Sequence, residues 1–325
     1  MTHLSDENTG GGATGAPIDH PLWLFGTEGA QEWLVPGRNR ELVPLAVLDF
    51  SDSAGYRGKG GRAMTVDSLH FLLAEIFLFE TDLPVSAVAF IDTDARKVVN
   101  FTHDMLTLEQ IAPFLETQEQ TPILAWGMAG EDLQDDGVEV RLRTPHDGRE
   151  RFLRVPLDEL GDTLVDWMVR KRCCRRIDPP SWYRRPGSDV LGGYAGALDN
   201  LLLQVVADGK NGLIDPHDAG THNRMADGAL DLAAARPGAA AQLELVALAT
   251  CLYARRAGVL DEVNRERAME LLQQPRPDDH PVRKLAPLWM FELGRKLEAL
   301  SLSMELARRA QGPYARWLAG LDQKA

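Results

Sequence analysis

Short apolar runs alternate with helical patterns along the first half of the chain. Branched and aromatic apolar residues fill positions 42–50, 85–91 and 123–130, and each run ends in polar or Gly-rich sequence. Such bounded runs are typical of buried strands. Between them, residues 65–80 and 108–115 carry apolar side chains at helical spacing. Strands that alternate with helices predict an α/β domain.

A hairpin and a helix complete this first pattern. Residues 138–143 and 151–155 nearly alternate polar and apolar positions and flank the turn sequence Pro145-His-Asp-Gly148, which predicts a β-hairpin. Residues 156–172 then place apolar side chains, Trp167 among them, on one stripe of a helix. The predicted fold of this half is a mixed sheet with flanking helices.

The second half of the chain is helical throughout in its pattern. Its Ala- and Leu-rich segments are joined by short breaks at glycine and proline, which predicts antiparallel helix pairs in a bundle or an irregular α-solenoid. A repeat of fixed length near 34 residues is not found. The predicted helices cover residues 189–207, 217–235, 239–257, 260–273, 282–300 and 301–318.

These patterns divide the chain into four parts. Residues 1–17 are rich in glycine, threonine and other polar residues, and this composition predicts a disordered tail. The α/β domain follows over 18–175. Residues 176–188 hold three prolines and a glycine and predict a linker, because proline cannot continue a helix. The all-α domain occupies 189–325.

Composition narrows the class of protein. Of 325 residues, 44% are hydrophobic and 26% charged, which are values of a globular chain, and the net charge is −13. An acidic surface repels phosphate, so we expect neither a nucleic-acid binder nor a membrane protein. No secretory signal, no apolar run of about 18 residues and no C-x-x-C spacing occurs. We therefore expect a soluble, cytoplasmic protein with reduced thiols.

Five segments between residues 42 and 172 follow the pattern of one known family. They are Leu45-Ala-Val-Leu-Asp-Phe50, the helix from Thr65, Ile123-Leu-Ala-Trp-Gly127, Gly137-Val-Glu-Val-Arg-Leu142 and the helix over 158–168. In these segments the chain resembles the N-terminal-like domain of TolB, an α/β module of bacterial proteins that is often followed by helical repeats. It departs from the family at the hairpin turn. The resemblance implies an interaction or assembly module, here with a tetratricopeptide-like helical domain, and names no active site.

A glycine-rich basic segment lies between a predicted strand and a predicted helix. Residues 55–62 read Gly-Tyr-Arg-Gly-Lys-Gly-Gly-Arg. At such a position backbone N–H groups and the helix dipole can bind a phosphate, with Gly58, Lys59, Gly60 and Arg62 as the candidate residues. The spacing matches neither common phosphate-binding glycine motif. The alternative is a basic surface loop.

His217, Asp218 and His222 lie within six positions of one another. Metal sites use about three such ligands, so these residues are candidate ligands. The competing interpretation is that Asp218 caps the helix that follows, because Asp before a helix commonly accepts its first N–H groups. We expect no metal here.

Two cysteines, Cys173 and Cys174, lie in the basic sequence Arg170-Lys-Arg-Cys-Cys-Arg-Arg176. Nearby cations lower the pKa of a thiol and would make it reactive. The alternative is a solvated basic helix end, whose cations suit the negative end of the helix dipole.

An aromatic and basic group closes the predicted linker. Trp182, Tyr183, Arg184 and Arg185 either hold the two domains together or form a surface that binds an acidic partner.

No nucleophile elbow, H-E-x-x-H or kinase motif occurs in the sequence. The chain is therefore predicted to be a non-catalytic interaction or regulatory protein, in which an α/β recognition module is coupled to a helical partner-binding domain. The predicted partner is a protein of unknown identity, and a homo-oligomer is compatible with these features. No cofactor is expected. The alternative is a nucleotide- or phosphate-binding enzyme that uses residues 55–62.

Overall fold

The chain divides into two compact units. The computed structural model describes residues 3–5, 12–27, 29–52, 68–92, 97–98, 105–129, 137–146, 148–206, 217–235 and 240–322. The first unit comprises residues 1–21, 36–179 and 187–199, and the second comprises 22–35, 180–186 and 200–325. Each unit is therefore built from three segments that are not contiguous in the sequence. Residues 22–35 were predicted to lie within the α/β domain, but they belong to the helical second unit.

A mixed sheet forms the first unit. In the described residues its order is β1-β2-β4-β3-β6-β7-β8, with β5 beside β4. β3 pairs in parallel with β4 and β6, and the other pairs are antiparallel. The predicted α/β class is confirmed. The strands are β1 (His3–Ser5), β2 (Gly12–Ile18), β3 (Leu45–Asp52), β4 (Val85–Asp92), β5 (Lys97–Val98), β6 (Ile123–Ala129), β7 (Val138–Arg143) and β8 (Glu150–Val155).

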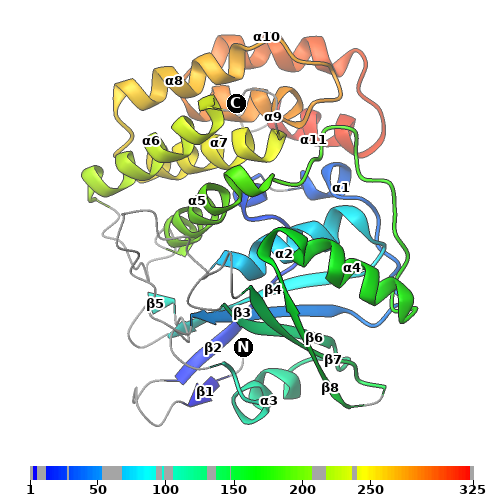
Figure 1. Cartoon of the computed structure of the whole chain (residues 1–325). Helices are drawn as coiled ribbons and strands as arrows, with labels where there is room; N and C mark the ends of the chain where they lie inside the picture. Colours follow the sequence, from blue (N-terminus) through cyan, green and yellow to red (C-terminus); the bar gives the residue numbers. More distant parts are fainter. Residues whose placement is uncertain are drawn as a thin grey trace. The chain divides into compact units, whose positions relative to one another are not determined.

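Helices cover both faces of this sheet. α2 (Leu69–Glu80) and α4 (Leu160–Arg170) lie on one face, and α3 (Leu108–Glu116) lies on the other (Figure 1). On the α3 face, Leu48, Phe90, Phe114 and Trp126 form a buried cluster, and the Trp126 indole N–H donates to the Leu106 carbonyl at 2.9 Å. Every residue of α2 is buried. A 3₁₀ turn, η3 (Leu157–Glu159), precedes α4.

The predicted disordered tail is wrong for residues 3–5, which form β1, and for residues 12–17, which belong to β2. This strand pairs antiparallel with β4 from Ala13 to Ile18, so its backbone groups take part in the sheet. Its small side chains have a packing reason. A Cβ atom at Gly15 would lie 3.1 Å from the Phe114 ring, so glycine lets the aromatic side chain approach the strand. Composition alone predicted disorder for this segment, because its residues are small or polar.

Helices build the second unit around α7 (Ala241–Arg256), in which residues 241–254 are all buried. The others are η1 (Leu22–Leu24), α1 (Gln31–Leu34), α6 (Ala219–Ala235), α8 (Glu262–Gln273), α9 (Pro281–Glu292), α10 (Lys296–Ala307) and α11 (Gly312–Asp322). Helix α5 (Ser188–Val206) contributes residues to both units. In the described part of the chain, none of the helices is long and apolar enough to cross a bilayer.

The predicted helix over 282–300 is wrong, because it breaks at Gly294. Gly294 has φ +91°, a conformation that other residues adopt only at a cost. Its N–H donates to the Phe291 carbonyl and the Arg295 N–H donates to the Met290 carbonyl, which is a Schellman motif. The break divides the predicted helix between α9 and α10, and α10 extends to Ala307.

Candidate functional site

The carboxyl end of β3 is the point where the topology of the first unit favours a ligand. β3 has a parallel neighbour on each side, so the chain leaves it toward β4 and later returns on its other side as β6. In open α/β sheets, ligands bind outside the carboxyl ends of strands at such a switch point. Residues 55–62 begin three positions after the end of β3 in the sequence.

The predicted phosphate-binding residues Gly58, Lys59, Gly60 and Arg62 lie outside the described residues. The structure does describe the strand before them and the helix after them, β3 and α2, as the sequence predicted. Phosphate binding by this segment stays a prediction.

Buried polar side chains lie at this end of the sheet. Asp49 and Ser51 belong to β3, and Ser68 and His70 lie at the start of α2. His70 Nδ1 is 3.8 Å from Asp49 Oδ1, which also accepts the Phe50 backbone N–H at 2.9 Å. Burying a carboxylate and an imidazole together carries a desolvation cost that an apolar core would avoid. This group is therefore a polar feature of the switch point that the sequence pattern did not identify.

A second buried polar pair lies further along α2. The Tyr194 hydroxyl of α5 donates to Glu75 Oε2 at 2.8 Å, and both residues are buried within the first unit. The hydrogen bond satisfies one oxygen of a carboxyl that would otherwise be costly to bury. It also ties the first half of α5 to α2, across 119 positions of sequence.

The three candidate metal ligands do not share a site. His217 and Asp218 are exposed, whereas His222 is buried and lies 3.2 Å from the Gln204 amide. The Asp218 carboxylate accepts hydrogen bonds from the Thr221 N–H and hydroxyl, which is the geometry of a helix cap. The described residues contain no group of three or more ligand side chains that could hold a metal ion.

The predicted partner surface is only partly available. Tyr183 is buried, and Trp182 is half-buried and packs edge-on against Trp23, with the ring centroids 6.2 Å apart. The carbonyl of Arg184 accepts a hydrogen bond from Gln242. Tyr183 is therefore corrected from a surface residue to a buried one, because its ring is removed from solvent. Partner binding by Trp182, Arg184 and Arg185 stays a prediction.

The surroundings of the two thiols at the end of α4 raise their pKa. Burial raises the pKa of Cys173, although the nearby Lys171 cation opposes it. Burial, together with the Asp82 carboxylate, raises the pKa of Cys174 to about 12. These shifts oppose the activation that the neighbouring cations Lys171 and Arg176 would give, which favours the interpretation of a basic helix end. Reactivity of the two thiols stays a prediction.

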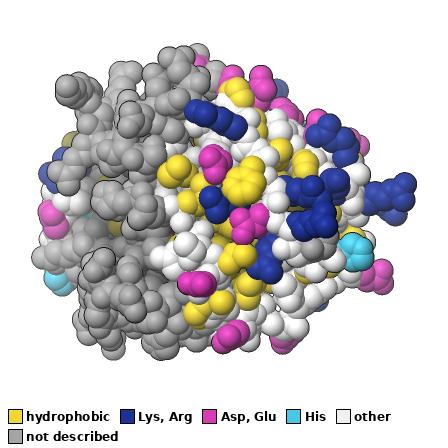
Figure 2. Space-filling model, turned by 60° about the horizontal axis from the view of Figure 1, so that its bottom comes forward, with side chains coloured by type: hydrophobic (Ala, Val, Ile, Leu, Met, Phe, Trp, Pro, Cys, Tyr) yellow, Lys and Arg dark blue, Asp and Glu magenta, His cyan; other side chains and the backbone are white. Residues whose placement is uncertain are grey.

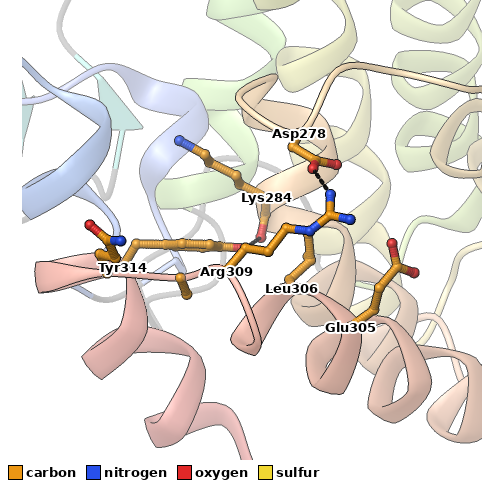
Figure 3. Close-up of a pocket in the computed structure, with 8 residues that line it drawn as sticks. Asp278, Lys284, Glu305, Leu306, Arg309 and Tyr314 are labelled. Atoms are coloured by element: carbon orange, nitrogen blue, oxygen red, sulfur yellow. Dashed lines mark hydrogen bonds and ion pairs between the residues drawn. The ribbon is translucent and has the colours of Figure 1, made fainter.

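A small charged pocket lies in the second unit beside α9, α10 and α11 (Figure 3). Its volume is about 210 Å³. Arg309 donates to Asp278 at 2.5 Å and lowers the pKa of that carboxyl. Lys284 lies 5.5 Å from the centre of the Tyr314 ring, and burial raises the pKa of Tyr314. Small-molecule sites usually measure about 300–1,000 Å³, so this pocket fits a single side chain or a small ion.

Three large apolar side chains are exposed on one face of α10. Leu297, Leu300 and Met304 are spaced i, i+3 and i+7, which places them on one stripe of the helix. We call these three residues the α10 stripe. Leu297 is 84% exposed and Met304 is 63% exposed. Contiguous exposed apolar residues mark interaction sites more often than scattered ones do.

Comparison with models of protein families, with curated proteins and with solved structures finds no match for this chain.

Proposed function

We propose that this chain is a non-catalytic interaction protein whose helical part binds a partner protein through the α10 stripe. In this proposal the two compact units act as separate domains. The α/β unit is the recognition module, with the TolB-like character that its sequence resembles. The helical unit is a bundle or an irregular α-solenoid that presents α10.

The distribution of side chains around α10 carries the proposal. The buried face holds Ala299, Ser303 and Leu306, two of which are small. The larger apolar residues Leu297 and Met304 point to solvent instead. Packing within the second unit does not account for large apolar side chains on the outer face of α10. An apolar side chain stabilises a protein or a complex only where it is removed from water.

The partner surface that fits this stripe is the apolar face of an amphipathic helix. Leu297 and Met304 are seven positions apart, or about 10 Å along the helix axis, which is the length of two helical turns. Covering Leu297 and Met304 would stabilise a complex by about 3 kcal/mol, given their exposure and the usual transfer energies of such side chains. That is about a hundredfold in affinity.

The test compares partner capture by the parent chain and by a Leu297→Glu/Met304→Glu variant. Val263→Glu is the matched control, because Val263 on α8 is 67% exposed and lies outside the stripe. Tagged full-length chains are used to capture proteins from the native cell extract, and the captured proteins are quantified by mass spectrometry. Each candidate partner is then purified and titrated against the three chains by calorimetry.

We expect a partner that binds the parent and the Val263→Glu chain equally and binds the double variant at least about thirtyfold more weakly. A partner that binds all three chains with the same affinity would show that the α10 stripe is not the binding surface. If none of the captured proteins binds the purified parent chain in calorimetry, the proposed function itself is contradicted.

A second candidate function is supported by the switch point at β3. A phosphate-bearing ligand at this position would contact residues 55–62. Calorimetric titration of the parent with ATP and GTP, compared with a Lys59→Ala/Arg62→Ala variant, tests it. Saturable micromolar binding that disappears in the variant but persists in an Arg170→Ala/Lys171→Ala control would favour this candidate.

A further inference from the structure

We propose that a second copy of this chain pairs along β8, so that two sheets join into one around a twofold axis. In the described residues β8 pairs with β7 alone and ends the strand order. The outer edge of such a strand presents backbone N–H and C=O groups that another strand can pair with. An antiparallel, symmetric pairing brings the same edge of both copies together.

The side chains of β8 favour pairing rather than protection of the edge. Phe152, at the centre of the strand, is 58% exposed, and Arg141 of β7 lies over its ring at 4.8 Å. Arg151 and Arg154 are exposed, and Glu150 is half-buried. The central residue of β8 is aromatic, and its charged residues carry both signs, so that a second copy of the strand can neutralise them. Figure 2 shows hydrophobic side chains beside Lys and Arg side chains on the face turned to the viewer.

One register makes β8 complementary to itself. If Phe152 lies opposite Phe152 of the second copy, Glu150 of each copy lies opposite Arg154 of the other. Residues 150, 152 and 154 alternate with 151 and 153, so all three point to one face of the joined sheet. The pairing then has an aromatic pair on the axis and an ion pair on each side of it, all directly opposed. Arg151 lies opposite Leu153 on the other face.

The neighbouring registers are poorer. A shift toward the start of the strand puts Arg151 opposite Arg151, and directly opposed like charges are destabilising. A shift toward its end puts Glu150 opposite Pro156, which has no N–H to donate. The ion pair with Arg154 of the second copy is then lost, and Glu150 keeps only Arg141 of its own chain, 3.6 Å away. The charges of β8 therefore select the register centred on Phe152.

The test is a charge exchange measured by analytical ultracentrifugation of the full-length chain. Glu150→Arg alone puts two arginines opposite each other in the pairing, and Arg154→Glu alone puts two glutamates opposite each other. The Glu150→Arg/Arg154→Glu double variant restores opposite charges in reversed order. Concentration series at low salt give the dimer dissociation constant of each chain, and circular dichroism checks that each is folded.

We expect the parent to shift from monomer to dimer with rising concentration. Each single variant should need at least about tenfold more protein, because two symmetric pairs change sign, and the double variant should recover to within about threefold of the parent. A parent that stays monomeric at several hundred micromolar overturns the proposal. A dimer that does not respond to the single changes, or that the double change fails to restore, overturns it as well.

A Phe152→Cys chain gives an independent measurement if a charge variant fails to fold. The two cysteines would face each other across the axis at a separation that a disulfide can span. Mild oxidation should then yield a covalent dimer, while the parent and an Arg151→Cys chain under the same conditions should not. Equal cross-linking of all three chains would contradict the register. The Leu297→Glu/Met304→Glu variant should dimerise like the parent, which separates this proposal from the function proposed for α10.

Discussion

Replacement of Arg276 by methionine is expected to destabilise the second unit by about 3–5 kcal/mol. The Arg276 guanidinium Nε donates to Glu244 Oε2 at 3.1 Å, and the two side chains are only 6% and 9% exposed. The same guanidinium donates to the carbonyls of Leu271 and Gln274 at 2.6 and 3.1 Å. It therefore neutralises a buried carboxylate and satisfies two backbone oxygens at the end of α8.

The expected magnitude follows from what the substitution leaves behind. Methionine keeps much of the aliphatic volume, so the main change is that the Glu244 carboxylate stays buried without its cation. Removing one member of a buried pair usually costs about 3–5 kcal/mol, whereas replacing both with apolar residues is often neutral. A Glu244→Leu/Arg276→Met chain should therefore be close to the parent in stability, and the two substitutions should be strongly non-additive.

The loss should also depend on pH in a direction that the burial determines. Burial lowers the pKa of His280 in the folded chain, and the Arg276 cation lowers it further. A histidine whose folded-state pKa is lowered destabilises the folded state as pH falls through its unfolded pKa. This cost should be smaller in the variant, because the Arg276 cation is gone. The gap in stability between variant and parent should therefore be smaller at pH 5 than at pH 7.5.

Urea unfolding followed by tryptophan fluorescence measures this change. Five of the seven tryptophans, at positions 23, 33, 182, 289 and 317, belong to the second unit, so the signal reports mainly on it. The control is Arg265→Met, because Arg265 pairs with the exposed Glu262 and surface pairs contribute about 0–1 kcal/mol. If Arg276→Met costs no more than the control, or if the double variant is as unstable as the single one, the reasoning about buried charge is refuted.

Three further changes test the packing and the chemistry of the fold. Gly127→Ala should cost about 1–3 kcal/mol in urea unfolding, because a Cβ atom there would lie 2.1 Å from a backbone oxygen of β7, whereas Gly228→Ala, with open space around it, should be neutral or stabilising. Gly294→Ala should lower stability by about 1–2 kcal/mol, since its φ of +91° strains a residue with a side chain, and an unchanged unfolding midpoint would contradict the Schellman motif. The thiols of Cys174 and Cys251, whose pKa values burial raises to about 12, should react with a thiol reagent at pH 8 far more slowly in the folded than in the urea-unfolded chain, and the folded rate should rise with pH.

Local patterns in the sequence were enough to predict most of the individual elements. The segments that became β3 and β6 are recognisable as short apolar runs bounded by polar or Gly-rich sequence, which is typical of buried strands. The segments that became β7 and β8 are recognisable by near alternation, because side chains along a strand repeat every two residues. The same approach misread the segment that forms β2. Its glycine, alanine and threonine residues carry little hydrophobic signal, and the backbone pairing with β4 that orders them comes from a strand some 75 positions away.

Helix ends were harder to predict than helix interiors. Gly294 lies within a continuous apolar and polar pattern, and one glycine inside a helical pattern does not by itself predict a break. The positive φ at this residue becomes visible only when the chain turns and α10 packs back against α9. The break also sets the phase of α10, and so which of its residues point outward.

Composition and periodicity of the sequence by themselves determined the α/β character of the first half, the helical character of the second and the absence of familiar catalytic motifs. Only the tertiary structure decided which residues meet and which faces are covered. Tyr194 finds Glu75 and Arg276 finds Glu244 through contacts between distant segments, which no local pattern encodes. Both sides of α10 carry apolar residues, and the sequence does not distinguish a stripe that packs from one that stays exposed. The physical reason is that spacing along a helix fixes the direction of each side chain relative to its neighbours, whereas burial depends on which other helix occupies that direction.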